Sequence, residues 1–157
     1  MRFVVTDSRT TLRERLGSLS LFALLAIGCS LASAADIGQV KVAKGQVDVE
    51  RNGQTIPAKV GMRLETADVV RTGADGAIGI TMADNSLLST GPNSILSLDR
   101  FDYDPTTNHG RFDTALQKGS LSVISGRMAK QSPDAMTVRT PSAILGVRGT
   151  EFVVSAQ

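Results

Sequence analysis

The chain has 157 residues, with 17 Lys and Arg against 15 Asp and Glu, one histidine, one cysteine and no tryptophan. This length suffices for one compact domain. One histidine without a cysteine or histidine nearby excludes the usual structural zinc sites and a histidine-based catalytic triad.

The first 34 residues have the pattern of a secretory signal peptide. Four arginines outnumber two acidic residues in the head, and an uncharged apolar run from Leu19 to Leu31 follows,. Ala32-Ser33-Ala34 has the small-x-small form that a signal peptidase accepts, which predicts cleavage after Ala34 and a mature domain of residues 35–157. The apolar run is shorter than the roughly 20 residues that cross a bilayer, so no transmembrane span is expected in the mature chain.

Cys29 leaves two alternatives open. The stretch LAIGC resembles the lipobox of bacterial lipoproteins, whose cysteine becomes the acylated first residue, although Ala26 stands where that box prefers leucine. There are therefore two alternatives to cleavage after Ala34: lipidation at Cys29, and retention of the leader as an anchor. The sequence predicts an exported protein, periplasmic or secreted.

The predicted mature domain is electrically neutral, because the leader holds four of the 17 basic and two of the 15 acidic residues. The basic pI of about 9.0 thus comes from the leader and does not indicate a nucleic-acid partner. The only cysteine also lies in the leader, which excludes disulfides, thiol catalysis and cysteine-ligated metals from residues 35–157. No cofactor is expected.

Residues 38–57 show the alternation of two β-strands joined by a hairpin. Lys41 and Asp48 stand on one side of the pattern, and the opposite side holds Val40, Val42, Val47 and Val49,. Between the runs, Asn52-Gly53 predicts a type I′ turn, since both central residues of that turn need positive φ.

Further strands are expected after residue 76. Asp84-Asn85-Ser86 predicts a turn, DAMTVRT and TEFVVS close the chain, and the inward candidates between them are Ile78, Ile80, Met82, Leu96, Leu98, Leu121 and Val123. No stretch after residue 35 has a helical apolar stripe. A Gly-x-Val-x-Val or Gly-x-Leu-x-Val unit recurs at Gly38, Gly45 and Gly119. The prediction is an all-β fold, a solenoid-like or sandwich stack of short antiparallel strands and hairpins.

Several motifs in this order resemble the FecR domain family of bacterial envelope proteins, across residues 38–154. The family's hallmarks are Gly-x-x-Leu-x-x-x-Asp-x-Val-x-Thr, an Asp-Gly-Ser-like turn and a terminal Thr-Pro with Arg-Gly-Thr. Asn85 replaces the usual turn glycine, and asparagine also tolerates positive φ. The matching residues are Gly61, Leu64, Asp68, Val70, Thr72, Asp84, Thr140, Pro141, Arg148, Gly149 and Thr150.

The resemblance implies a non-enzymatic module of the cell envelope. Family members that regulate iron uptake also carry a cytoplasmic anti-sigma segment, a membrane helix and a receptor-contacting domain, whereas this chain carries the FecR-like part. It is therefore expected to resemble the short secreted members of the family.

Arg148 is the most conspicuous residue of the terminal motif. Its planar guanidinium has five donors, and the nearby glycines allow close backbone approach. We expect Arg148 to clamp strand ends together, with Glu65, Asp68 or Glu151 as acceptors. The alternative is an arginine presented to an anionic ligand.

An acidic stretch at residues 99–109 offers a second candidate site. Asp99, Asp102 and Asp104 could supply oxygen ligands to calcium, although the glycine and glutamate positions of an EF-hand are missing. The alternative is a solvated turn opened by Asp104-Pro105, with Phe101 and Tyr103 packed inward.

The functional expectation is binding and not catalysis. The acidic residues cluster in turns, where solvent keeps carboxyl pKa values ordinary, and no phosphate-binding loop is present. One candidate function is a protein-protein interaction or signalling module whose exposed strand edges bind another envelope protein. The other is a binding module for envelope polysaccharide or peptidoglycan, which usually requires exposed aromatic side chains.

Overall fold

The computed structural model describes residues 36–132, 134–148 and 151–157. Within them the only helix, α1 (Arg127–Gln131), is too short to cross a membrane. The strands are β1 (Gly38–Lys44), β2 (Val47–Arg51), β3 (Gln54–Pro57), β4 (Arg63–Leu64), β5 (Val69–Thr72), β6 (Ala77–Met82), β7 (Leu87–Thr90), β8 (Ile95–Tyr103), β9 (Gly110–Ile124), β10 (Met136–Arg139), β11 (Ile144–Val147) and β12 (Glu151–Ala156).

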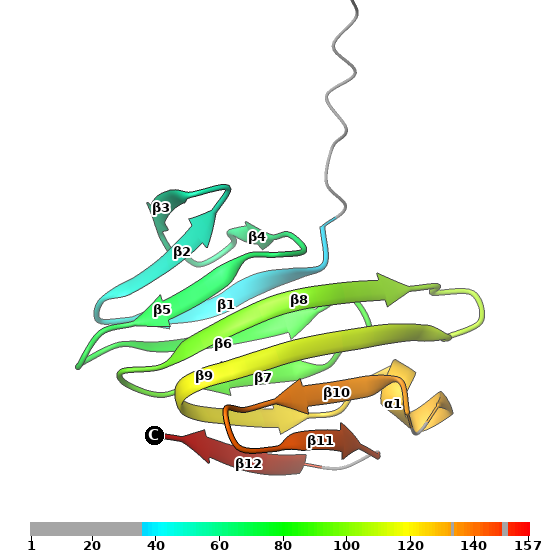
Figure 1. Ribbon diagram of the computed structural model, residues 1–157. Helices are drawn as coiled ribbons and strands as arrows, with labels where there is room; N and C mark the ends of the chain where they lie inside the picture. The colour runs from blue at the N-terminus through cyan, green and yellow to red at the C-terminus, as the bar shows by residue number, and fades with distance from the viewer. Residues whose placement is uncertain (1–35, 133, 149–150) are drawn as a thin grey trace, which may run out of the picture. The chain divides into compact units, whose positions relative to one another are not determined.

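The twelve strands form one mostly antiparallel sheet that curls on itself into two layers (Figure 1). The β8 layer contains β3, β2, β5, β8, the first part of β9, β10 and β11. The β6 layer contains β4, β1, β6, β7, the last part of β9 and β12. The long strand β9 belongs to both layers, because residues up to Lys118 pair with β8 and residues from Leu121 pair with β7.

Four of the short segments in which the chain crosses from one layer to the other, which we call passages, are hydrogen-bonded to one another. The amide of Gly73 donates to the carbonyl oxygen of Gln46 (2.8 Å), that of Asn93 to Gly73 (3.0 Å), and that of Gly91 to Ser120 (3.3 Å). These bonds satisfy backbone groups that strand pairing leaves open. The predicted all-β class of short antiparallel strands is confirmed, in the form of one curled sheet.

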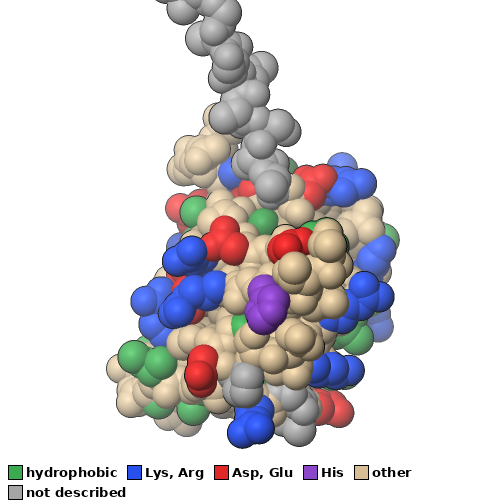
Figure 2. Space-filling model, turned by 90° about the vertical axis from the view of Figure 1, so that its right-hand side faces the viewer, with side chains coloured by type: hydrophobic (Ala, Val, Ile, Leu, Met, Phe, Trp, Pro, Cys, Tyr) green, Lys and Arg blue, Asp and Glu red, His purple; other side chains and the backbone are tan. Residues whose placement is uncertain are grey.

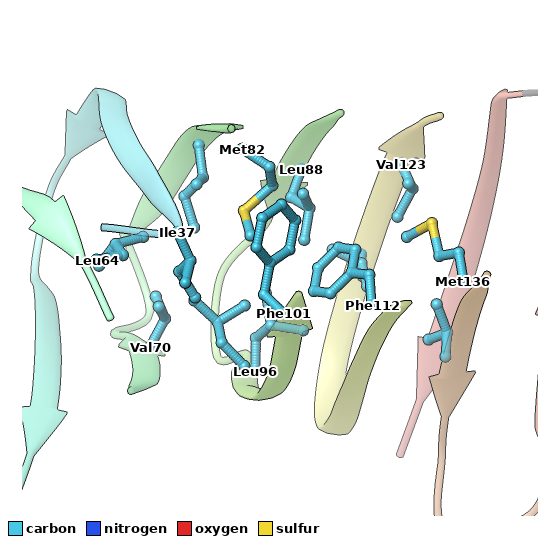
Figure 3. Packing of buried hydrophobic residues seen from close by; sticks show 14 of the residues in the cluster. Ile37, Leu64, Val70, Met82, Leu88, Leu96, Phe101, Phe112, Val123 and Met136 are labelled. Carbon is cyan, nitrogen blue, oxygen red and sulfur yellow. The ribbon is translucent and has the colours of Figure 1, made fainter. Parts of the chain in front are cut away.

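The core lies between the two layers and is made of apolar side chains from both. Figure 3 shows Met82 and Leu88 of the β6 layer next to Phe101 and Phe112 of the β8 layer. The rings of Phe101 and Phe112 pack edge to face, with centroids 5.4 Å apart and planes at 72°, a favoured arrangement for aromatic pairs. All seven inward candidates predicted after residue 76 are buried.

Both predicted turns are confirmed by their backbone angles. Asn52 and Gly53 have φ of 51° and 75°, as a type I′ hairpin requires, and Asn85 has φ of 66°,. The strands therefore end at the turns that the sequence predicts.

One side-chain direction was predicted wrongly. Val42 is 44% exposed and not inward, because the register of β1 against β6 shifts between Val40 and Val42. The extra residue of this β-bulge reverses the alternation, so that Ala43 packs against the core instead. Strands β4, β5 and β11 and helix α1 were also missing from the prediction.

Candidate functional site

The outer surface of the β8 layer carries four ion pairs. The paired side chains are Arg71 with Glu50, Arg100 with Asp102, Arg111 with Asp113, and Arg139 with Asp99, at N···O distances of 2.5–3.1 Å. The hydrogen bond from Arg111 lowers the pKa of Asp113. Exposed pairs of this kind contribute little stability, so their main effect is a well-hydrated surface.

The outer surface of the β6 layer has a different character over β6, β7, the end of β9 and most of β12. The outward side chains there, which we call the uncharged face, are Ala77, Gly79, Thr81, Leu87, Ser89, Ser120, Ser122, Ile124, Val153 and Ser155. Charged side chains border this face, namely Lys44 of β1 beside Ala77, Arg63 of β4, and Glu151 of β12 beside Ile124. Strand pairing places them in rows, for example Gly79 beside Ser89, Ser122 and Val153. Small side chains in register make this face flat.

Large apolar side chains stand out from the uncharged face. Leu87 and Ile124 are paired neighbours and 42% and 43% exposed, Val153 is 69% exposed, and Val42 borders the face from β1. Exposed apolar side chains gathered on one surface of a soluble protein usually mark an interaction site. The uncharged face is therefore the candidate functional site.

The five residues of the first family motif have structural roles. Leu64 and Val70 are buried in the core, Gly61 has φ of 89°, and Asp68 is fully buried. Thr72 accepts the amide of Ser94 (2.8 Å) and donates its hydroxyl hydrogen to the carbonyl oxygen of Gly91 (2.7 Å). The threonine thus holds one of the passages between the layers.

Arg51, and not Arg148, clamps the motif. Its Nε and Nη2 donate to the two carboxylate oxygens of Asp68 (2.8 and 2.7 Å), and its Nη1 donates to Glu65 (2.5 Å). The hydrogen bond to Asp68 raises the pKa of the Arg51 guanidinium, although partial burial opposes the shift. Arg148 is exposed, and two of the acceptors predicted for it, Glu65 and Asp68, are bound by Arg51. A clamp formed by Arg148 with the third, Glu151, stays a prediction.

A sequence signal could have identified the Arg51 pair. Asp68, Val70 and Thr72 are spaced two residues apart, which places all three side chains on the inner face of one extended segment,. A carboxylate in an inward position needs a cation. Arg51 immediately precedes the Asn52-Gly53 turn. The hairpin pairs β2 with β3, but it does not show that β5 lies on the other side of β2, so the sequence did not indicate that Arg51 is the cation.

The second motif forms a tight turn against the start of α1. Asp84 accepts the amide (2.9 Å) and the hydroxyl (2.8 Å) of Ser86. The Ser86 hydroxyl oxygen accepts the amide of Gly126 (2.9 Å), and the Asp84 carbonyl oxygen accepts that of Arg127 (2.9 Å). The turn therefore ties β6 and β7 to the segment that follows β9.

The remaining motif residues lie near the end of the chain. Thr140 and Pro141 form the turn between β10 and β11, where the Thr140 hydroxyl oxygen accepts the amide of Ala143 (3.0 Å). Gly149 and Thr150 lie outside the described residues, as do the predicted cleavage site at Ala34 and the possible lipidation site at Cys29.

The three carboxylates suggested for calcium are not brought together. Asp99 binds Arg139, Asp102 binds Arg100, and Asp104 accepts hydrogen bonds within its own turn. Among the described residues no three acidic, cysteine or histidine side chains gather as metal ligands would. The stretch forms the solvated turn of the alternative interpretation, with Phe101 buried and Tyr103 half-buried.

Charged side chains of both signs mix around this end of the molecule. Figure 2 shows basic and acidic groups interspersed around the histidine. His109 is exposed, and its Nδ1 lies 3.3 Å from the hydroxyl of Ser132. This polar end differs in character from the uncharged face.

The carboxyl group of Asp104 is expected to titrate below its ordinary pKa. The Thr107 hydroxyl (2.7 Å) and the Thr106 amide (2.8 Å) donate to it, and the first of these bonds lowers the pKa most, because both favour the ionised form. The stabilisation is therefore present above the ordinary carboxyl pKa and lost as pH falls through the lowered one. NMR titration should show the Asp104 pKa rising in Thr107→Val and staying low in Thr107→Ser; equal values in both variants would contradict this.

Comparison with known proteins identifies one family. A sequence model described as FecR protein matches residues 68–157. No curated protein and no solved structure matches the chain. The matched segment begins at Asp68, but β1 pairs with β6 and β2 pairs with β5. The described fold therefore extends beyond the matched segment toward the N-terminus.

Proposed function

The chain belongs to the FecR family, whose model matches more than half of it, and on this premise we propose a non-enzymatic protein-protein interaction or signalling module of the bacterial cell envelope. The leader pattern supports a periplasmic location, since its apolar run and small-residue end are those of an exported protein. The partner is another envelope protein.

The observation that carries the proposal is the contrast between the two outer surfaces. The β8 layer presents ion pairs, whereas the uncharged face presents Leu87, Ile124 and Val153 above a floor of small residues. Binding a partner over apolar side chains removes them from water, which is favourable by about 25 cal/mol per Å² of apolar surface. Hydrated ion pairs would oppose such burial.

The positions of the aromatic side chains favour a protein partner over a polysaccharide. Phe101 and Phe112 are buried, and Tyr103 and Phe152 are half-buried against the core. Among residues 36–132, 134–148 and 151–157 no aromatic ring is exposed. Sugar rings usually stack on exposed aromatic side chains, so the uncharged face suits a flat protein surface better.

Two charge-introducing variants test the role of the uncharged face. Leu87→Lys and Ile124→Lys place ammonium groups on it, and Ile144→Lys is the matched control on the β8 layer, where Ile144 is 73% exposed. The tagged protein would be purified from the periplasmic extract of cross-linked cells and its companions identified by mass spectrometry. We expect the native chain and Ile144→Lys to recover the same partner protein. The amount recovered with Leu87→Lys or Ile124→Lys should be at least about ten-fold lower.

Two results would speak against the proposal. Recovery of cell-wall polymer fragments alone would favour the alternative, a binding module for polysaccharide or peptidoglycan. Equal recovery of a protein partner with Leu87→Lys, Ile124→Lys and Ile144→Lys would show that the uncharged face is not its binding surface. Absence of the protein from the periplasmic extract would contradict the location.

A further inference from the structure

In the part of the chain that the structure describes, the curled sheet has four edge strands, of which three carry features that discourage further pairing. Strand β3 has four residues and ends in Pro57, β4 has only two residues, and β11 has four residues with Gly146 inside it. Short strands and proline are ways in which natural proteins protect sheet edges, and glycine weakens a strand interior.

Strand β12 carries none of these features along its length. It has six residues and pairs with β9 in unbroken register, from Glu151 opposite Ile124 to Ala156 opposite Gly119. It contains no proline, no bulge and one charged residue, Glu151, at its first position. Among the described residues β9 is the only strand paired with it, so its second edge is open.

The side chains of β12 are divided between the two faces of the sheet. Phe152, Val154 and Ala156 are half-buried against the core, whereas Val153 points outward and is 69% exposed. An added strand would shield the half-buried side chains further from water and would pair the open backbone groups.

We propose that β12 pairs antiparallel with β12 of a second copy of this chain, about a two-fold axis at Val153. Opposite residues of an antiparallel pair project to the same face. In this register Phe152 of each copy lies opposite Val154 of the other copy on the inner face. On the outer face Val153 meets Val153, and each Glu151 faces Ser155.

The register is self-complementary in charge as well as in apolar surface. The only carboxylate of β12 faces a hydroxyl side chain and not a second carboxylate, so like charges do not meet. Residues 35–157 are neutral as a whole, which leaves no net repulsion between copies. Because the contact is isologous, it closes with two copies and does not propagate into a fibre.

The pairing goes beyond the proposed function and is separable from it. It uses the edge of the β6 layer, whereas the partner protein is proposed to bind across the uncharged face, over Leu87 and Ile124 of the neighbouring strands β7 and β9. Six residues on each side make a small contact, so we expect a concentration-dependent equilibrium with a dissociation constant of roughly 1–100 μM.

Sedimentation velocity of the purified full chain is the test. We expect dimers that dissociate on dilution, and a dissociation constant at least about ten-fold higher for Val153→Lys, since two ammonium groups would meet at the axis. An equal mixture of Val153→Lys and Val153→Glu should restore the dimer, with one copy of each. Leu87→Lys and Ile144→Lys, both away from the edge of β12, should dimerise like the native chain.

Cysteine cross-linking checks the register independently of affinity. In a Cys29→Ser background, Val153→Cys should form a disulfide-linked dimer on mild oxidation, whereas Ser155→Cys should not, because Ser155 faces Glu151 and not itself. A native chain that stays monomeric at 100 μM or more, loss of the dimer in Ile144→Lys, failure of the Lys and Glu variants to associate, or equal cross-linking at both positions would overturn the proposal.

Discussion

Replacing Arg51 with alanine is expected to lower the free energy of unfolding by about 3–5 kcal/mol, the usual cost of leaving a buried charge without its partner. Asp68 is fully buried, and Arg51 binds both of its carboxylate oxygens. The remaining donor to that carboxylate is the amide of Glu65 (2.8 Å), which cannot neutralise it. Urea unfolding followed by circular dichroism measures the change.

The matched control is Arg63→Ala. Arg63 also forms an ion pair, with Asp36, but both side chains are exposed, and exposed pairs contribute about 0–1 kcal/mol. In a double-mutant cycle, Arg51→Met with Asp68→Leu should lose less stability than the two single variants added together, since the apolar pair leaves no buried charge. Equal losses for Arg51→Ala and Arg63→Ala would refute the clamp.

Gly119→Ala is the second change with a large expected effect, a loss of about 3 kcal/mol or more. Gly119 has φ of 91°, in the region that side chains rarely adopt. A Cβ atom there would lie 2.1 Å from Oγ and 2.5 Å from Cα of Ser94. Ser94 holds the neighbouring passage between the layers, so it has little room to move.

Gly61→Ala is the control that separates the cost of the backbone conformation at Gly119 from the cost of the contact with Ser94. Gly61 has almost the same φ, 89°, but a Cβ atom there meets nothing within 4 Å. This variant is expected to lose only the backbone term, about 1–2 kcal/mol, and the difference between the variants measures the contact with Ser94. If thermal unfolding gives the same loss for both, the close approach of the two passages is not what requires glycine at residue 119.

Three residues of the first two family motifs join parts of the fold. Asp68 anchors the Arg51 clamp, Thr72 fixes the passage at Gly91 and Ser94, and Asp84 fixes the turn against α1. The uncharged face and the edge of β12 contain none of these residues.

Most strands and both turns could be predicted from the sequence, because the signals for them are local. Alternation with period two assigned Ile78, Ile80 and Met82 to the core, and Asn52-Gly53 set a turn through two adjacent φ angles. Such patterns depend on neighbours within a few residues, so a single chain displays them.

Contacts between residues far apart in the sequence could not be predicted in this way. Arg51 reaches Asp68 across 17 positions, and the bulge that turns Val42 outward follows from the register of β1 against β6. The separation of ion pairs from the uncharged face also depends on strand order, which brings β6, β7, the end of β9 and β12 together. Strand order and register are set by packing of the whole sheet, and alternation within one strand carries no information about them.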